Sequence, residues 1–230
     1  MSLFYQDIQY QLDRSNRKTA SVTIERDGTV VVRVPEKINS ETIEKLLEQK
    51  REWIYKRLTE WQSLNRPQRR KNYVNGESFM YLGRVYRLEI ITDSSSDLTL
   101  HGQYFYLRAG VKNPAQVFKD FYRIQGQKII QAQVAYFAPL LGLPIKKVRV
   151  LDLQYRWASC SQTTLNFHWK VAMTSLSIID YLVVHELCHF LHSRHDTDFW
   201  NTVQKILPNY LEQKSWLKQH GADLVLPESS

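Results

Sequence analysis

The sequence carries a His-Glu-x-x-His motif made of His185, Glu186 and His189. Residues four apart on a helix lie on one face, one turn apart, so the imidazoles of His185 and His189 can reach the same metal ion. Neutral imidazole is a good zinc ligand, and a catalytic zinc keeps one coordination position for water. Glu186 follows the first ligand and can accept a proton from that water as a general base. The spacing therefore predicts two zinc ligands and the base of a hydrolase.

A third ligand is needed, and His195 is the candidate because it follows His189 by six residues. In an unbroken helix His195 would be rotated off the face of the other two histidines. His192 would share that face, but it would lie about 10 Å from His185 along the helix axis. We therefore expect a turn near Ser193 and Arg194 that brings His195 back toward the ion.

Further segments accompany the motif: Trp157-Ala158-Ser159-Cys160, Leu165-Asn166, and His195 followed by Phe199-Trp200. Together with the motif helix they resemble the YgjP-like zinc metallopeptidase-like family, most closely from about residue 148 to 217. Ala158 stands where that family has Gly, a substitution that we expect the fold to tolerate. The resemblance also suggests kinship with SprT-like zincins.

The resemblance implies zinc, one ion per chain, held by His185, His189 and His195, with Glu186 as the base. It implies peptide bonds of a peptide or protein as the substrate. It also implies a zincin-like fold for the C-terminal portion.

Three residues outside the motif are candidates for substrate binding: Arg156, Trp157 and Tyr210. An edge strand beside the metal could bind an extended peptide by strand addition, and Arg156 and Trp157 could wall that cleft. Trp157 could equally fill the core beneath the motif helix. Tyr210 or Arg156 could stabilise an oxyanion.

A histidine that binds a metal usually donates its other ring N–H to a second group. Asp180, Asp198 and Glu212 are the acids near the motif that could accept such a bond. The sequence leaves the choice among them open.

The elements that must position these residues alternate between strands and helices. Apolar periodicity and turn residues predict strands at 4–12, 18–26, 29–34, 77–82, 85–91, 98–101, 104–108, 147–153 and 164–171. Helices are expected at 41–64, 113–141, 178–191, 196–207 and 208–220. This pattern predicts an α+β protein with a β-rich N-terminal portion and a zincin-like C-terminal portion. We expect hairpins, a helix and a basic linker in residues 1–72, a small β meander in 73–112, and the metal-binding catalytic portion in 113–230.

The composition limits the class of protein. A hydrophobic content of 43% over 230 residues supports a packed core and excludes a disordered chain. Two distant cysteines, Cys160 and Cys188, do not form a disulfide framework and indicate reduced, buried thiols. No signal peptide and no membrane span are apparent, so we expect a cytoplasmic protein with no membrane partner.

The net charge of +8 leaves an acidic partner open, such as a nucleic acid or a nucleotide. The densest basic cluster spans residues 66–71, where a solvated linker is the simpler interpretation.

The favoured prediction is a zinc-dependent metallohydrolase that acts as a metallopeptidase. One alternative is a metal-dependent hydrolase of nucleotide phosphoanhydrides, for which no glycine-rich phosphate loop is visible. Another is a SprT-like, DNA-associated protease with a steep salt dependence of binding. The last is a non-catalytic zinc module closed by a fourth protein ligand, either His192 or Glu212.

Overall fold

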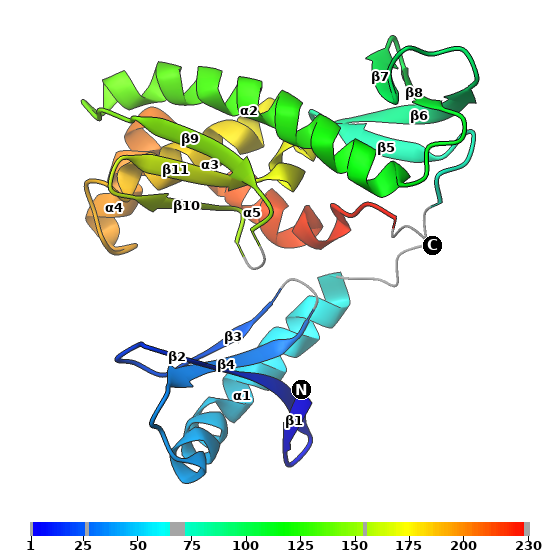
Figure 1. The fold of residues 1–230 in the computed structure, drawn as a ribbon. Coiled ribbons are helices and arrows are strands. Elements are labelled where there is room, and N and C mark those ends of the chain that lie inside the picture. Colours follow the sequence, from blue (N-terminus) through cyan, green and yellow to red (C-terminus); the bar gives the residue numbers. More distant parts are fainter. Residues whose placement is uncertain (1, 26–27, 65–71, 154–155, 228–230) are drawn as a thin grey trace. The chain divides into compact units, whose positions relative to one another are not determined.

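The structure is a computed structural model that describes residues 2–25, 28–64, 72–153 and 156–227 (Figure 1). The chain forms two compact units. Unit 1 comprises Met1–Gln68 with Gly221–Asp223, and unit 2 comprises Arg69–His220 with Leu224–Ser230. The basic cluster at 66–71 lies almost wholly outside the described residues, as does Asp27 of the hairpin turn expected before residue 29.

Unit 1 is a four-stranded sheet with one long helix. The strands are β1 (Ser2–Tyr5), β2 (Ile8–Ser15), β3 (Ser21–Ile24) and β4 (Val30–Pro35), and the helix is α1 (Ser40–Leu64). The side chain of Asn39 caps this helix by accepting the backbone N–H of Thr42 at 3.0 Å. Val32 and Val34 are fully buried and pack with Leu47 of α1, so the helix covers one face of the sheet.

Residues 4–12 were expected to form one strand, and that expectation was wrong. They belong to a hairpin in which β1 pairs antiparallel with β2, with Tyr5 opposite Ile8. Gln6 occupies the turn with a positive φ of 51°. The turn has no glycine, so the alternating apolar residues on both sides of it resemble one continuous strand.

Unit 2 begins with a sheet of the same topology. Its strands are β5 (Ser78–Tyr81), β6 (Arg84–Ile91), β7 (Leu98–His101) and β8 (Tyr104–Arg108). The strand order β5-β6-β8-β7 repeats the order β1-β2-β4-β3 of unit 1. In both sheets two antiparallel hairpins meet through a parallel central pair, β2 with β4 and β6 with β8. A long helix follows each sheet, here α2 (Pro114–Leu140), so the chain contains this four-strand and helix module twice.

In unit 2 this module shares one hydrophobic core with the residues that follow it. Phe79 of β5 stacks on Phe118 of α2, with ring centroids 4.4 Å apart. Tyr122 is fully buried and its hydroxyl donates to the backbone oxygen of Met80 at 2.7 Å. The same core continues into the motif helix through residues such as Ile179. The separation of 73–112 from 113–230 as distinct domains stays a prediction.

The scaffold of the site is a three-stranded sheet with helices around it (Figure 1). Its strands are β9 (Lys147–Leu151), β10 (Ala158–Ser161) and β11 (Thr164–His168), and the order β10-β11-β9 leaves β10 at an edge. The last strand was expected to continue to residue 171, but a 3-10 helix, η1 (Trp169–Met173), replaces its end. The remaining helices are α3 (Leu176–Cys188), α4 (Thr197–Ile206), α5 (Tyr210–His220) and the 3-10 helix η2 (Gly221–Asp223).

Two glycines mark where segments of unit 2 approach closely. A Cβ on Gly126 of α2 would lie 3.2 Å from the Cβ of Ala172 in η1. A Cβ on Gly83, in the turn between β5 and β6, would lie 2.9 Å from the Cα of Ser175. The N–H of Gly83 donates to the backbone oxygen of Met173 at 3.0 Å. The first hairpin of unit 2 is therefore held against the segment that begins α3.

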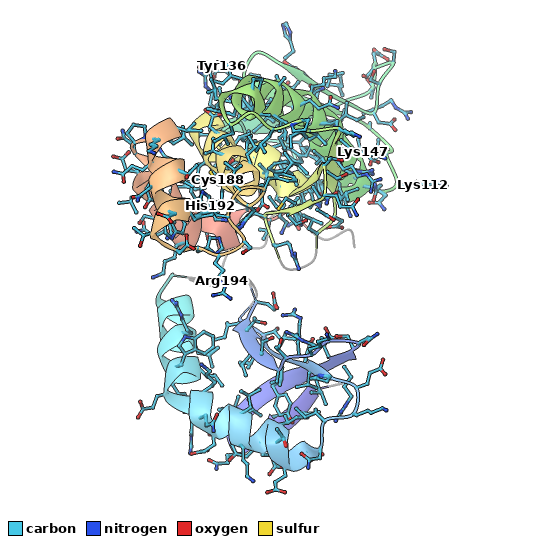
Figure 2. The ribbon with its side chains drawn as sticks, turned by 90° about the vertical axis from the view of Figure 1, so that its left-hand side faces the viewer. Lys112, Tyr136, Lys147, Cys188, His192 and Arg194 are labelled. Carbon is cyan, nitrogen blue, oxygen red and sulfur yellow. The ribbon has the colours of Figure 1, made fainter. Side chains whose placement is uncertain are left out.

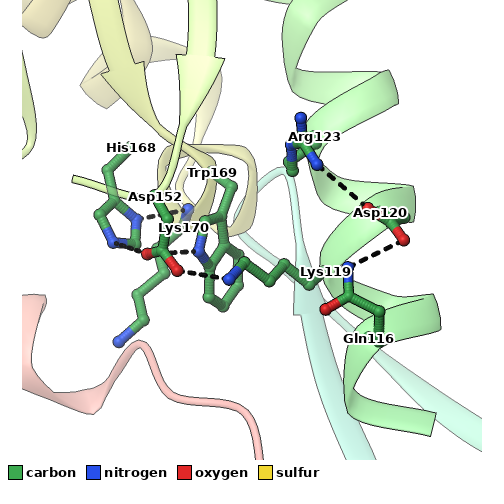
Figure 3. A network of polar contacts seen from close by, with 8 residues as sticks. All are labelled: Gln116, Lys119, Asp120, Arg123, Asp152, His168, Trp169 and Lys170. Atoms are coloured by element: carbon green, nitrogen blue, oxygen red, sulfur yellow. Dashed lines mark hydrogen bonds and ion pairs between the residues drawn. The ribbon is translucent and has the colours of Figure 1, made fainter. Parts of the chain in front are cut away.

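Asp152, just after β9, joins α2 to the strand ends (Figure 3). Its carboxylate accepts hydrogen bonds from Lys119 of α2 and, at 3.2 Å, from the indole of Trp169. Nε2 of the buried His168 lies 3.3 Å from the same carboxylate. Burial acts to raise the pKa of Asp152, but the hydrogen bonds from Lys119 and Trp169 outweigh burial and hold the pKa below its usual value.

The fold class is α+β, as the sequence predicts, with sheets and helices in separate layers. Among the described residues, none of the helices combines the length and apolar content that crossing a membrane requires.

Candidate metal centre

The motif helix ends earlier than the sequence suggests. A helix was expected to residue 191, but α3 ends at Cys188, and His189 is its C-terminal cap. The chain then turns, and the N–H of His192 donates to the backbone oxygen of Cys188 at 2.9 Å. Bends follow at Ser193 and Arg194, where the turn toward His195 was expected. Because the helix stops at His189, the next residues are free to fold back over its last turn.

This fold-back brings the three predicted histidines together. Ring nitrogens of His185, His189 and His195 all lie within 4.8 Å of one another. Nε2 of His185 and Nε2 of His195 are 3.0 Å apart. Two histidines bound to one tetrahedral zinc at about 2.05 Å would place their nitrogens about 3.3 Å apart. The cluster therefore has the dimensions of a zinc site, and among the described residues it is the one group of three or more such side chains with this geometry.

The protonation of His185 and His195 also suits a metal. Burial, followed by the nearby His189 and His195, lowers the pKa of His185 to about 3. Burial likewise lowers the pKa of His195. Neutral imidazoles present lone pairs, and two lone pairs that face each other at 3.0 Å repel unless a proton or a cation lies beside them. Nδ1 of His189 lies 3.3 Å from the backbone oxygen of His192, an arrangement that leaves its Nε2 for a ligand.

Two aromatic residues of α4 hold the imidazoles in place. Phe199 is fully buried, and its ring centroid lies 4.7 to 5.0 Å from those of all three histidines. Trp200 stacks on His195 at 5.5 Å. Asp196 fixes the start of this helix, because its side chain accepts the N–H of Phe199 at 3.0 Å. The sequence singled out Phe199 and Trp200 only as part of the family resemblance and did not show that Phe199 contacts the whole cluster.

His192 does not join the cluster. It lies beside α4, and its Nε2 forms a hydrogen bond with the hydroxyl of Thr202 at 3.0 Å (Figure 2). Glu212 is exposed on α5 and is not part of the cluster either. Neither of the two residues considered as a fourth ligand therefore lies with the three histidines.

Among the acids considered as partners of the histidines, Asp180 has another partner, and Asp198 and Glu212 are exposed. Asp180 accepts a hydrogen bond from Gln133 of α2, and burial raises the pKa of its carboxyl group. Asp198 is exposed on α4. For His189 a backbone oxygen takes the place of the carboxylate that was expected.

Glu186 is buried, with 7% of its surface exposed, and it lines a cavity of about 370 Å³ together with His185. Burial raises the pKa of Glu186 to about 7, although a hydrogen bond with Cys160 and the charge of Arg156 act in the opposite direction. Cys160 lies in the edge strand β10 and is a free thiol, as is Cys188. The sequence predicted free thiols correctly, but Cys160 is half-buried rather than buried, and the sequence gave no sign that Cys160 contacts Glu186.

The same cavity is lined by two of the three residues predicted to bind substrate, Arg156 and Trp157. Trp157 is half-buried: it lines the cavity and also packs against the core. The two positions that the sequence left open for Trp157, in the cleft wall and in the core, are therefore both partly occupied. Tyr210 is not among the lining residues. It stacks on Trp200, with ring centroids 5.2 Å apart.

The cavity wall also contains Tyr181, Lys214 and Lys218, which the sequence did not single out. Tyr181 precedes His185 by one helical turn, and its ring lies 5.7 Å from that imidazole. Its position four residues before His185, on the same helix face, could have identified Tyr181 as a neighbour of the site from the sequence. Burial raises the pKa of Tyr181 to about 12, so the phenol remains a hydrogen-bond donor near neutral pH. The two lysines reach the cavity from α5, and no local pattern points to them.

A family model described as YgjP-like, metallopeptidase domain, matches residues 18–220. The chain belongs to the YgjP-like family. The resemblance that the sequence motifs carry is thereby confirmed, and the chain is a metallopeptidase-type hydrolase whose family implies a metal ion and peptide substrates. The relation to SprT-like zincins stays a prediction.

Among solved structures, the chain is similar to the crystal structure of the metallopeptidase zymogen of Pyrococcus abyssi abylysin. The identity is 23%, and the match covers 38% of this chain and 90% of the other, with a TM-score of 0.36. No curated protein matches the chain.

Proposed function

We propose that this YgjP-like protein is a zinc-dependent peptidase in which His185, His189 and His195 hold the ion and Glu186 is the general base. The observation that carries the proposal is the meeting of the three histidine nitrogens within 4.8 Å, beside a cavity that Glu186 also lines. A set of three imidazoles suits zinc and leaves a coordination position for the reaction.

A zinc ion bound there would polarise the scissile carbonyl and make a water molecule more acidic. The protein supplies the remaining functions. Glu186 accepts the proton of the attacking water and passes it to the leaving amine. The thiol of Cys160 contacts the Glu186 carboxyl group and orients it. Phe199 excludes water from beneath the histidines and fixes their ring orientations.

The edge strand β10 suits an extended peptide. It pairs with β11 on one side and packs against α3, which carries the motif. Strand addition to its other side would lay a substrate next to the cavity that Arg156 and Trp157 line. This arrangement supports binding of peptide main chain by β10.

The alternatives differ in their support. Nucleotide hydrolysis remains a second candidate because cationic side chains line the cavity. DNA association gains no support, since the basic cluster at 66–71 lies almost wholly outside the described residues. A closed, non-catalytic zinc module is disfavoured by the position of His192, which bonds to Thr202. A cytoplasmic location stays a prediction.

The test combines metal analysis with substrate screening. Purified protein and its Glu186→Gln variant would be loaded with zinc, analysed for metal content, and incubated with a quenched-fluorescent peptide library and a nucleotide panel. We expect one zinc per chain in both proteins. We expect peptide cleavage that falls by about 10²- to 10⁴-fold in Glu186→Gln.

Glu212→Gln is the matched control, because Glu212 is an exposed glutamate outside the cavity lining. It should retain both zinc and activity. Absence of stoichiometric zinc, or peptide cleavage unaffected in Glu186→Gln, would disprove the proposal. Hydrolysis of nucleotides alone would replace it with the second candidate.

A further inference from the structure

We propose that the cavity beside the metal centre selects substrates with a carboxylate group next to the cleaved bond. The carboxylate belongs either to an aspartate or glutamate side chain or to the C-terminus of the peptide. This inference rests on the proposed peptidase function and specifies its substrate class.

The cavity carries an excess of positive charge. Arg156, Lys214 and Lys218 line it, and Glu186 is the one acid among the described lining residues. The three cationic side chains are exposed, whereas Glu186 is buried. A substrate that enters therefore meets the cations first. A carboxylate is attracted to such a rim, and a lysine or arginine side chain is repelled by it.

The cations come from two separate parts of the chain. Lys214 and Lys218 lie one turn apart on α5, and Arg156 precedes the edge strand β10. Among the described residues, no carboxylate forms an ion pair with Arg156 or Lys214. Glu186 is the one described acid on which the charge of Arg156 acts, so Lys214 in particular remains available to a substrate carboxylate.

Lys214 is held close to the reaction centre. Its Nζ lies 3.8 Å from the ring centroid of Trp200, and Trp200 stacks on His195. The ammonium group is thus one aromatic ring away from a candidate metal ligand. A carboxylate bound to Lys214 would lie near the scissile bond rather than on a distant part of the surface.

The other walls of the cavity favour a single side chain or a chain end. They are apolar or aromatic and include Trp157, Tyr181, Leu182 and Leu217. A volume of about 370 Å³ is at the lower end of the range for small-ligand pockets. Apolar walls reduce the local dielectric constant, which strengthens charge pairing at the rim. The planar guanidinium of Arg156 is suited to bind both oxygens of a carboxylate.

The test uses matched peptide pairs with the zinc-loaded, full-length protein. One pair exchanges Glu for Gln at each position beside the cleaved bond, and the other exchanges a C-terminal acid for an amide. We expect kcat/KM for the better acidic peptide to exceed that of its neutral partner by about two- to fivefold at low salt. The preference should shrink at 0.5 M salt, because exposed charges are screened. The pair that responds identifies the source of the carboxylate.

Charge-reversal variants link the preference to the cavity. Lys214→Glu and Lys218→Glu should each abolish the acidic preference or turn it into a preference for a lysine-containing peptide. Lys205→Glu is the matched control, since Lys205 is exposed in the last turn of α4 and does not line the cavity. Binding of the same peptides to Glu186→Gln, measured by fluorescence anisotropy, should show the same order of affinity without turnover. Zinc content is measured in every variant.

The two proposals fail separately. Peptide cleavage with equal kcat/KM for acidic and neutral partners, or a preference that survives in both lysine variants, overturns this inference and leaves the peptidase intact. Absence of cleavage of any peptide by the zinc-loaded protein overturns the proposed function. In that case, the absence of preferential binding of acidic peptides to Glu186→Gln overturns this inference as well.

Discussion

Nε2 of His195 lies 3.0 Å from Nε2 of His185, although ten residues separate them in the chain. The two rings meet because α3 ends at Cys188 and the segment after it turns back along the helix. His192 lies closer in sequence, yet its side chain faces Thr202 of α4. The third position of the cluster is therefore determined by the turn and by α4 together.

We expect His195→Ala to weaken zinc binding by more than about a hundredfold, since even the loss of an outer-shell partner costs 10- to 100-fold. The matched control is His192→Ala, which should retain one zinc per chain. Competition titration with a chelator measures both affinities. Unchanged zinc affinity in His195→Ala, or its loss in His192→Ala instead, would assign the third ligand differently.

Cys160 contacts the carboxyl group of Glu186, and this contact should affect the reaction rate. Cys160→Ala removes the donor, and we expect kcat to fall about two- to tenfold, the usual range for one hydrogen bond, with KM and zinc content unchanged. Cys160→Ser restores a donor and should recover most of kcat. Equal kcat in the alanine and serine variants would show that the thiol only fills space.

Gly83 should be more sensitive to substitution than another glycine of the same sheet. Gly83→Ala combines a positive φ of 74° with a contact of 2.9 Å to the backbone of Ser175, so we expect a loss of about 2 to 4 kcal/mol in unfolding free energy. Gly102 has a positive φ of 58° but no neighbour within 4 Å, so Gly102→Ala should cost only about 1 kcal/mol. Urea denaturation measures both. Equal losses would mean that the hairpin is not pressed against Ser175.

Asp152 should make stability depend on acid pH. Because its pKa in the folded state lies below that of the unfolded chain, its contribution is present above about pH 4 and is lost as the pH falls through the folded-state pKa. Its side chain is 55% exposed, so the contribution is below about 1 kcal/mol. Asp152→Asn should lower stability at pH 7 and flatten its decline below about pH 4.

Asp120→Asn is the matched control for that measurement. Asp120 forms an ion pair with Arg123 on the surface of α2, away from the strand ends (Figure 3). Its replacement should leave the pH dependence of the unfolding midpoint close to that of the unmodified protein. If stability fell as steeply with acid pH in Asp152→Asn as in the unmodified protein, Asp152 would not be a cause of that fall.

Features that depend on neighbouring residues could be predicted from the sequence. Helix periodicity placed His185 and His189 on one face of the helix, because this geometry depends only on their spacing of four residues. Glu186 follows His185 directly in the sequence. The helix N-caps at Asn39 and Asn113 also depend on local sequence, because each side chain accepts the backbone N–H of the residue three positions later. The hairpin at Gln6 was missed because a non-glycine residue adopts its positive φ.

Features that depend on packing between distant segments could not be predicted in this way. The sequence named His195 and a turn near Ser193 and Arg194, but it predicted a helix to residue 191, whereas α3 ends at Cys188 and Phe199 packs against all three histidines. The repetition of the four-strand module was recognised only from the order of the strands in the two sheets. This order could not be predicted, because register and strand direction are set by pairing between strands.

The sequence by itself predicted the chemistry of this protein, namely three candidate metal ligands and a candidate base, and its motifs identified the family. The tertiary structure alone decided what surrounds that chemistry. It brought Cys160 to Glu186 and placed Lys214 and Lys218 of α5 in the wall of the cavity that Glu186 lines. The physical reason is that local spacing fixes which side chains share a helix face, whereas contacts between elements follow from how their buried faces pack.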